Sequence, residues 1–366
     1  MHAVSGRRPY TAVLVVPTGI GAAVGGYAGD ALPVARAMAA VVDTLITHPN
    51  VMNGAQLYWP LPNAYYVEGY GLDQFAAGTW GLRPVHRNRI GLVLDAAIED
   101  DLRWRHLQAA DAARATLGLD LIDYVVTDAP LEVSLRTATS GATWGTIGRP
   151  DSLLRAAERA IAAGAEAIAV VARFPEDTDS DVLQDYRQGQ GVDPLAGAEA
   201  VISHLVVRTL RVPCAHAPAL SPLPLDPSVA AKSAAEEIGY TFLPCVLAGL
   251  SRAPQFVVSP TPLGQAKDTL WANQVDAIVV PASACGGSAL LSLGRRSLAI
   301  AVEANATALA VSPESVGVPA VRVASYLEAV GLLAAHRAGI HPQALTAQMP
   351  HLRELRPDPQ ILPLGR

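Results

Sequence analysis

Short apolar runs alternate with segments of helical period along almost the whole chain. The apolar runs that predict buried strands lie at 11–16, 89–95, 122–130, 165–174, 276–282, 298–303 and 307–312. These runs are continuous rather than alternating, which is typical of strands buried on both faces. The pattern predicts an α/β fold with a mainly parallel sheet and helices on both faces.

The segments between these runs place apolar residues at the spacing of one helix face. Helices are predicted at 30–46, 150–164, 197–210, 228–239 and 324–340. Asp30 is a candidate N-cap, and Ser325 with Glu328 has the spacing of a capping box. Because the second half repeats the strand and helix pattern of the first, two pseudo-similar lobes are one arrangement that it allows.

Two stretches interrupt this rhythm, one polar and acidic at 175–194 and one proline-rich at 217–228. Such stretches either separate lobes or form a lid. The predicted organisation is an N-terminal α/β lobe at 1–174, a polar linker or lid at 175–196, a C-terminal α/β lobe at 197–345 and a tail at 346–366.

Composition narrows the class of protein. The 366 residues carry a formal net charge of −6, which makes a nucleic acid an unfavourable partner. Three widely spaced cysteines do not form a disulfide framework, which indicates a cytoplasmic protein. Two arginines precede the first apolar run as in a twin-arginine export signal, but Pro17 and several glycines interrupt the run. We therefore expect no membrane partner, and a homo-oligomer stays open.

The first predicted strand runs into a glycine-rich loop that precedes a helix. Glycines in such a place let backbone amides approach a phosphate or carboxylate group. The spacing is neither the dinucleotide fingerprint nor a Walker loop. The alternative is a tight turn with close packing. The predicted ligand-binding residues of this loop are Thr18, Gly19, Gly21, Gly25 and Gly26.

A second loop of small residues follows the strand predicted at 276–282. Here Gly286 and Gly287 would expose amides beside Cys285, and a helix that begins near Ser288 would lower the pKa of the thiol. This pattern predicts a thiolate nucleophile with an oxyanion hole. The alternative is a small buried cysteine at a tight turn.

Histidines and cysteines lie between these two loops along the chain. His216 is the candidate general base for Cys285. His204 and His216, with Cys214 and Cys245, also include the ligand types of zinc, although their spacing matches no common zinc module. Core packing is the favoured role of Cys214 and Cys245.

Carboxylates end three of the predicted strands, namely Asp95 and Asp128 in the first half and Glu303 in the second, of which Asp95 and Glu303 are assigned to the site. Because the carboxyl ends of parallel strands meet in one crevice, both acids are candidate catalytic residues. With His216 or His204 they would also form a divalent metal site. Capping of a following helix is the alternative for each acid.

An irregular segment at 47–81 holds many of the aromatic residues of the chain, interleaved with polar ones. Apolar walls with a few placed polar groups describe a small-molecule pocket, so this segment is predicted to cover the site. A subunit interface is the alternative. The predicted ligand-facing residues of this segment and of the glycine-rich loop near residue 140 are Asn53, Tyr58, Glu68, Ser140 and Thr143.

Four runs resemble an uncharacterised bacterial family known only as a domain of unknown function. They are VVPTGIGAAVGGYAGDALPVAR, LITHPNVMNGAQLYWP, YVEGYGLDQFAAG and PCAHAPAL. The resemblance extends over nearly the whole chain and implies a single cytoplasmic protein. It implies no activity and no catalytic residues.

The sequence therefore predicts a cytoplasmic enzyme that acts on a small polar or anionic metabolite. The predicted class is a hydrolase, lyase or isomerase in which Cys285 reacts, His216 is its base, and Glu303 or Asp95 orients the base or the substrate. No cofactor is predicted. A metal-dependent enzyme is the first alternative, and a non-catalytic ligand-binding or scaffold protein is the second.

Overall fold

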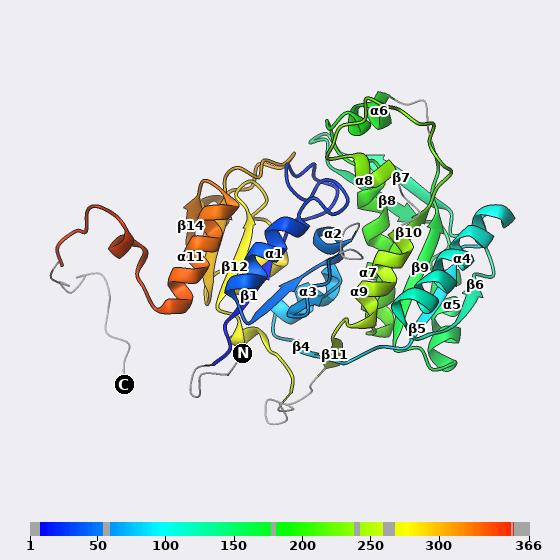
Figure 1. Cartoon of the computed structure of the whole chain (residues 1–366), viewed down its shortest axis with the longest axis horizontal. Coiled ribbons are helices and arrows are strands. Elements are labelled where there is room, and N and C mark those ends of the chain that lie inside the picture. Colours follow the sequence, from blue (N-terminus) through cyan, green and yellow to red (C-terminus); the bar gives the residue numbers. More distant parts are fainter. Residues whose placement is uncertain are drawn as a thin grey trace.

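The computed structural model has two parallel β-sheets that stand side by side, with helices packed against both (Figure 1). Within each of these sheets, every pair of neighbouring strands is parallel. This arrangement confirms the predicted α/β fold. The structure describes residues 8–53, 59–176, 181–237, 242–258, 268–352 and 354.

The first sheet has six strands in the order β14-β13-β12-β1-β2-β3. Their bounds are β1 (Thr11–Leu14), β2 (Thr44–Thr47), β3 (Ala64–Tyr66), β12 (Ala277–Pro281), β13 (Leu298–Val302) and β14 (Ala320–Val323). The central strand β1 is buried along its whole length. The sheet joins strands from both ends of the chain, so the predicted boundary between the 1–174 and 197–345 segments does not separate the two sheets.

The second sheet has four strands in the order β10-β9-β5-β6. Their bounds are β5 (Ile90–Leu94), β6 (Leu121–Val126), β9 (Ala167–Arg173) and β10 (Cys214–Ala219). An antiparallel hairpin of β7 (Val133–Thr137) and β8 (Thr143–Ile147) accompanies it. Because the two parallel sheets differ in strand number and order, the pseudo-similarity of two lobes is not confirmed.

Helices cover both faces of the first sheet. One face carries α1 (Leu32–Val41) and α11 (Tyr326–Ala338), whose buried residues pack with Ala12 and Leu14 of β1. The other face carries α3 (Gly69–Ala76) and α10 (Ser288–Leu293), which pack with Val13. Alternate residues of β1 therefore enter two different cores, as the period of a strand requires.

The second sheet is covered in the same way. On one face lie α4 (Asp100–Leu117) and α9 (Phe242–Ser251), and on the other lie α5 (Pro150–Ala162) and α7 (Ala196–Leu210). The shorter helices are α2 (Pro49–Met52), α6 (Asp181–Arg187) and α8 (Ala234–Glu237), with 3-10 turns at Ala272–Gln274, Glu314–Val316 and Pro342–Leu345.

A two-stranded antiparallel ribbon links the two sheets (Figure 1). It consists of β4 (Trp80–Arg83), through which the chain leaves the first sheet, and β11 (Gln255–Val258), which precedes its return. The rings of Trp80 and Phe256 pack at 5.0 Å between centroids on this ribbon. The outgoing and returning segments are therefore held together at one place.

Some predicted elements have different bounds. The helix predicted at 30–46 ends at Val41, because Thr44–Thr47 pairs with β1 as a strand. The strand predicted at 307–312 is reduced to a single bridge between Val311 and Ala284. In the first case residues 44–47 form a strand instead of the predicted helix, because the strand buries their β-branched side chains beside β1.

The segment at 47–81, predicted as an irregular cover, contributes α2, β3, α3 and β4 to the body of the fold. Its aromatic residues Tyr66 and Phe75 are core residues with at most 3% of their surface exposed. Glu68 caps α3, since its side chain accepts hydrogen bonds from the amides of Tyr70 and Gly71. A polar residue of this segment, Glu68, therefore caps a helix, a role that the sequence analysis had not predicted.

The described residues of the tail predicted at 346–366 are exposed. Among the helices that the structure describes, none combines the length and the apolar character needed to cross a bilayer.

The close contact of α7 with β8 generates a stability prediction. A Cβ atom on Gly197 would lie 2.0 Å from the carbonyl oxygen of Thr143, so Gly197→Ala must displace backbone. We expect it to lower the free energy of unfolding by about 1–3 kcal/mol, as overpacking does. Gly331→Ala in α11 is the matched control, because a Cβ there meets no described atom within 4 Å.

The control should raise stability by about 0.5–1 kcal/mol through helix propensity. Urea denaturation followed by circular dichroism measures both variants. Equal stability of Gly197→Ala and the unsubstituted protein would contradict the close contact.

Candidate functional site

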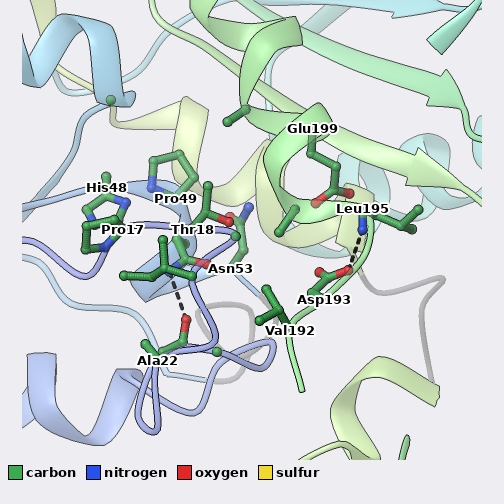
Figure 2. Close-up of a pocket in the computed structure, with 18 of the residues that line it drawn as sticks. Pro17, Thr18, Ala22, His48, Pro49, Asn53, Val192, Asp193, Leu195 and Glu199 are labelled. Atoms are coloured by element: carbon green, nitrogen blue, oxygen red, sulfur yellow. Dashed lines mark hydrogen bonds between the residues drawn. The ribbon is translucent and has the colours of Figure 1, made fainter. Parts of the chain in front are cut away.

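A cavity of about 520 Å³ lies between the two sheets. Figure 2 shows Thr18, Ala22 and His48 from the side of the first sheet, and Val192, Asp193 and Glu199 from the side of the second. A volume of this size is typical of small-molecule pockets. The cavity is therefore the candidate site.

The structure brings many of the predicted residues to this cavity. Those that line it are Thr18, Gly19, Gly21, Gly25, Gly26, Asn53, Glu68, His216, Gly286, Gly287 and Ser288. The loops that follow β1 and β12 meet here because these strands are parallel neighbours and end at the same edge.

Two predicted carboxylates lie elsewhere. Asp95 is fully buried at the end of β5, where its oxygens accept hydrogen bonds from the amides of Ala97, Leu131 and Arg173 at 3.0, 3.0 and 3.2 Å. Glu303 lines a separate surface hollow and forms an ion pair with Arg322 at 3.4 Å. Neither acid lines this cavity, so the predicted meeting of these strand ends in one crevice is not observed.

Two further predicted residues, Ser140 and Thr143, do not line the cavity. Ser140 is exposed in the turn between β7 and β8. Thr143 lies behind the cavity wall, where its amide donates to the carbonyl of Gly19 at 2.9 Å and its hydroxyl donates to the carbonyl of Asp193 at 3.0 Å. It therefore fastens two loops of the wall to each other. Tyr58 lies outside the described residues.

The thiol of Cys285 is a core group. It has no exposed surface, and its Sγ donates to the carbonyl oxygens of Pro281 and Ala282, both at 3.6 Å. Burial raises the pKa of the thiol to about 11, which keeps it protonated. The geometry opposes the predicted nucleophile and favours a small residue packed at a tight turn.

Carboxylates of the chain itself occupy the amides of the glycine-rich loop. The Gly25 amide donates to Asp30 Oδ1 and the Ala28 amide donates to Glu236 Oε1, both at 2.6 Å. Asp30, predicted as an N-cap of the next helix, instead holds this loop. An anionic ligand would have to displace these acids, so the loop is a poor cradle for a phosphate.

The loop after β12 is occupied in the same way. The Asp73 carboxylate of α3 is hydrogen-bonded by the Ser288 side chain and the Ala289 amide at the start of α10. Of the donors that the sequence predicted for a ligand, the Gly25 amide and the Ser288 side chain are thus used within the protein. The polar part of the cavity wall is consequently acidic.

The segment after β2 holds the glycine-rich loop in place. The Val16 amide donates to His48 Nε2 at 3.0 Å, and the Asn50 side-chain amide donates to the carbonyls of Val16 and Gly25 at 2.8 and 2.9 Å. Burial lowers the pKa of His48 to about 4, so its ring stays neutral and accepts this bond. Asn53 lines the cavity beside it (Figure 2).

Three acids gather on the other wall, namely Asp193, Glu199 and Glu236. Burial raises the pKa of each, to about 7 for Glu236, and Coulombic repulsion from Asp193 raises the pKa values of both glutamates further. Asp193 is fixed by the Leu195 amide at 2.8 Å (Figure 2). Burial therefore favours the protonated form of these acids, although Asp193, whose pKa is raised to about 6, is largely ionised at pH 7.

Glu199 faces His216 across part of the cavity. Glu199 Oε2 and His216 Nε2 are 3.9 Å apart, and the two side chains are 16% and 14% exposed. The other ring nitrogen, Nδ1, is 3.0 Å from Ser203 Oγ. Burial, and then the charge of His204, lower the pKa of His216 to about 4. Burial thus favours the protonated form of Glu199 and the neutral form of His216, which lie opposite each other.

Glu68 and His204 form a second pair at the same cavity. Glu68 Oε1 and His204 Nδ1 are 2.5 Å apart and join α3 of the first sheet to α7 of the second. Burial lowers the pKa of His204, but the close contact and charge of Glu68, with the charge of Asp73, outweigh it, so the pKa is raised overall. His204 and His216 therefore favour opposite protonation states.

Sequence reasoning missed Asp193, Glu199 and Glu236 and considered His204 only as a metal ligand. One signal was available for Glu199, which lies four residues before Ser203 and so shares its helix face. Asp193 lies in the polar stretch at 175–194 and Glu236 lies in the helix predicted at 228–239, where no local pattern marks either of them. Their proximity comes from the packing of α8 and the α7 start against the glycine-rich loop.

Within the described parts of the chain, no three His, Cys, Asp or Glu side chains are grouped so that they could hold a metal ion. The predicted metal set is not assembled, since Asp95 and Glu303 lie away from His204 and His216. The predicted metal ligands therefore lie at different places in the structure.

Comparisons with known proteins identify a family of unknown function. The chain matches the family described as "Protein of unknown function (DUF3326)" over residues 11–346. It is 63% identical over 340 residues to a protein of Synechococcus sp. named "Uncharacterized lipoprotein", covering 93% of this chain and 94% of that protein. No solved structure matches. The resemblance to an uncharacterised family is confirmed.

One prediction is corrected by this comparison. The chain was expected to be cytoplasmic, and a relative so similar over nearly its whole length bears the name of a lipoprotein. The cytoplasmic assignment is therefore withdrawn. The composition had indicated it only through the scarcity and spacing of cysteines, which an exported protein without disulfides shares.

The acidic wall predicts a pH-dependent gain of stability. A raised folded pKa contributes stability below the ordinary value of 4.5 that is lost as the pH rises toward about 7. Glu236→Gln keeps an acceptor for the Ala28 amide and removes this loss. We expect the variant to be more stable than the unsubstituted protein at pH 8, by about 1–3 kcal/mol, and equal to it at pH 4.

The matched control is Glu158→Gln on the exposed side of α5, which should show no such pH dependence. Thermal or urea unfolding across this pH range measures both variants. A loss of stability in Glu236→Gln at pH 8 would show that the charged carboxylate is favourable in the folded protein.

The buried thiol gives a second prediction. Iodoacetamide at pH 8 should label Cys285 far more slowly in the folded protein than in urea, because the side chain is covered and protonated. Peptide mass spectrometry measures the labelled fraction over time. Rapid labelling of Cys285 in the folded protein would restore it as a reactive residue.

Proposed function

Since this chain belongs to the DUF3326 family, whose description names no activity, we propose its function from the cavity alone. The protein is an enzyme that binds a small organic molecule between its two sheets. Glu199 and His216 transfer protons on that molecule. The proposal keeps the isomerase and lyase classes expected from the sequence and leaves out the cysteine.

The observation that carries this proposal is a carboxyl group and an imidazole 3.9 Å apart at the cavity wall, where burial raises the pKa of Glu199 and lowers the pKa of His216. The separation is too long for a hydrogen bond between them, and one substrate atom or water beside them could contact both groups. General acid–base catalysis needs a group that donates and a group that accepts in the same place. Environments that push pKa values apart are typical of such assignments.

The cavity wall supports a substrate of a different charge from the one first expected. Apolar residues such as Ile20, Val192 and Leu290 line it, together with the acids described above. The acids disfavour a second strong anion nearby. The proposed substrate is therefore a compact, partly apolar molecule without a phosphate group.

A non-catalytic ligand-binding protein is the second candidate. The name of the Synechococcus relative favours it, because a lipoprotein held at a membrane surface would suit capture of a ligand. The cavity between two sheets joined by the β4 and β11 ribbon would serve binding equally well. Chemical conversion of a bound molecule separates the two candidates.

A metabolite screen by thermal shift tests the proposal, because specific ligands stabilise the folded state. Each stabilising compound is then incubated with the protein and followed by NMR. We expect at least one to be converted, and Glu199→Gln and His216→Asn to slow conversion by about 10²–10⁴-fold while they still bind it. Glu158→Gln is the matched control and should convert at the unsubstituted rate.

The outcomes divide the candidates. Binding without conversion supports the ligand-binding protein and contradicts the enzyme. Conversion that survives both Glu199→Gln and His216→Asn contradicts the assigned acid and base. Stabilisation by phosphorylated compounds alone would contradict the proposed substrate class.

A further inference from the structure

We infer that His204, held by Glu68, binds a carbonyl or carboxylate oxygen of the substrate, which makes the substrate a carbonyl compound with a removable proton on the adjacent carbon. This inference rests on the proposed function and adds to it a substrate class and a third group. It starts from the geometry around Glu68.

Glu68 is held in a single orientation. Its side chain is 4% exposed, and its Oε2 accepts hydrogen bonds from the amides of Tyr70 at 2.8 Å and Gly71 at 3.3 Å. Its Oε1 is left to meet His204 Nδ1 at 2.5 Å. A carboxylate with both oxygens engaged has no freedom to turn, so it fixes the ring that it contacts.

The imidazole of His204 is fixed from other sides as well. A Cβ on Gly69 would lie only 3.1 Å from His204 Cε1, so the ring lies close over the backbone there. The Tyr70 ring meets it edge to face at 5.7 Å between centroids. With Nδ1 engaged by Glu68, the ring nitrogen that remains for a ligand is Nε2. The side chain is 42% exposed and lines the cavity.

His204 is the suitable cationic donor on the described part of the wall. The other cationic side chain that lines the cavity there is Arg187. Its guanidinium is engaged with both oxygens of Glu237 at 2.8 and 3.1 Å and with the Pro224 carbonyl at 2.9 Å. An oxygen that gains negative charge in this acidic cavity would therefore be stabilised by His204.

The neighbouring residues couple this donor to the proposed base. Ser203, which precedes His204, lies 3.0 Å from His216 Nδ1. The charge of His204 opposes protonation of His216, as noted above, so the cation keeps the base in its basic form. A fixed cation beside a neutral base is the arrangement that proton abstraction next to a carbonyl requires.

The step balances with these three groups. His216 Nε2 takes the proton of the carbon next to the carbonyl as that C–H bond breaks. The bonding pair forms the carbon–carbon double bond, and the carbonyl π pair moves to oxygen, which accepts a hydrogen bond from His204 Nε2–H. Glu199 then donates its proton to another carbon of the delocalised enolate, which restores the carbonyl on a rearranged product. Transfer of the abstracted proton from His216 to Glu199 restores the starting state.

NMR of the full chain labelled with ¹⁵N-histidine tests the role of His204. The probes are acetate, which carries the anionic oxygens, and acetamide, which has the same shape without the charge. At pH 7 we expect both nitrogens of His204 to be protonated, and acetate to shift the Nε2 signal saturably while acetamide shifts it far less. His204→Gln assigns the signal. Glu68→Gln should abolish the double protonation and the acetate shift, whereas Glu158→Gln should keep both.

The result that overturns the inference is a neutral His204 in the unsubstituted protein, or a His204 signal that acetate does not shift. Both readouts come from the unsubstituted protein, so misfolding of Glu68→Gln would not remove the test. They are also independent of turnover. An acetate-sensitive His204 combined with conversion that survives Glu199→Gln and His216→Asn would refute the proposed function alone.

Discussion

The parallel pairing of β1 with β12 is the constraint on which the rest of this structure depends. It places a strand from residues 11–14 beside one from residues 277–281 in the middle of a buried sheet. The chain between them must leave this sheet and return to it, and it does so through the β4 and β11 ribbon. The two covalent crossings between the sheets therefore lie together in this one tether, to which contacts such as that of Glu68 with His204 add, and the cavity forms where the two sheets face each other.

The polar chemistry of the cavity follows from that tether. Loops at the strand ends of the first sheet meet acids carried by the second part of the chain, so Glu236 reaches the Ala28 amide and His204 reaches Glu68. Buried carboxyls with raised pKa values cost stability at neutral pH. Natural proteins retain such destabilising groups where function needs them. The acidic wall of the cavity is therefore a better candidate for a functional site than the apolar core.

Cys285 shows how a loop that looks catalytic can have a structural origin. Small residues after β12 are needed because the chain turns tightly there, with the Cys285 amide bonded to the Val311 carbonyl at 2.9 Å. The thiol fills the space beneath that turn. The same loop still borders the cavity through Gly286 and Gly287, so the predicted location was close to the site although the predicted chemistry was not.

The sequence by itself determined the α/β class, the burial of most strands and the loops that border the cavity. These follow from local patterns of apolar residues, glycines and caps, as α5, α7 and α11 illustrate. Only the tertiary structure decided which sheet each strand joins and which acids reach the cavity. Pairing between strands far apart in the sequence leaves Asp95 buried away from the cavity and places Glu199 at its wall. The protonation of these acids depends on the burial and the neighbouring charges that this pairing creates.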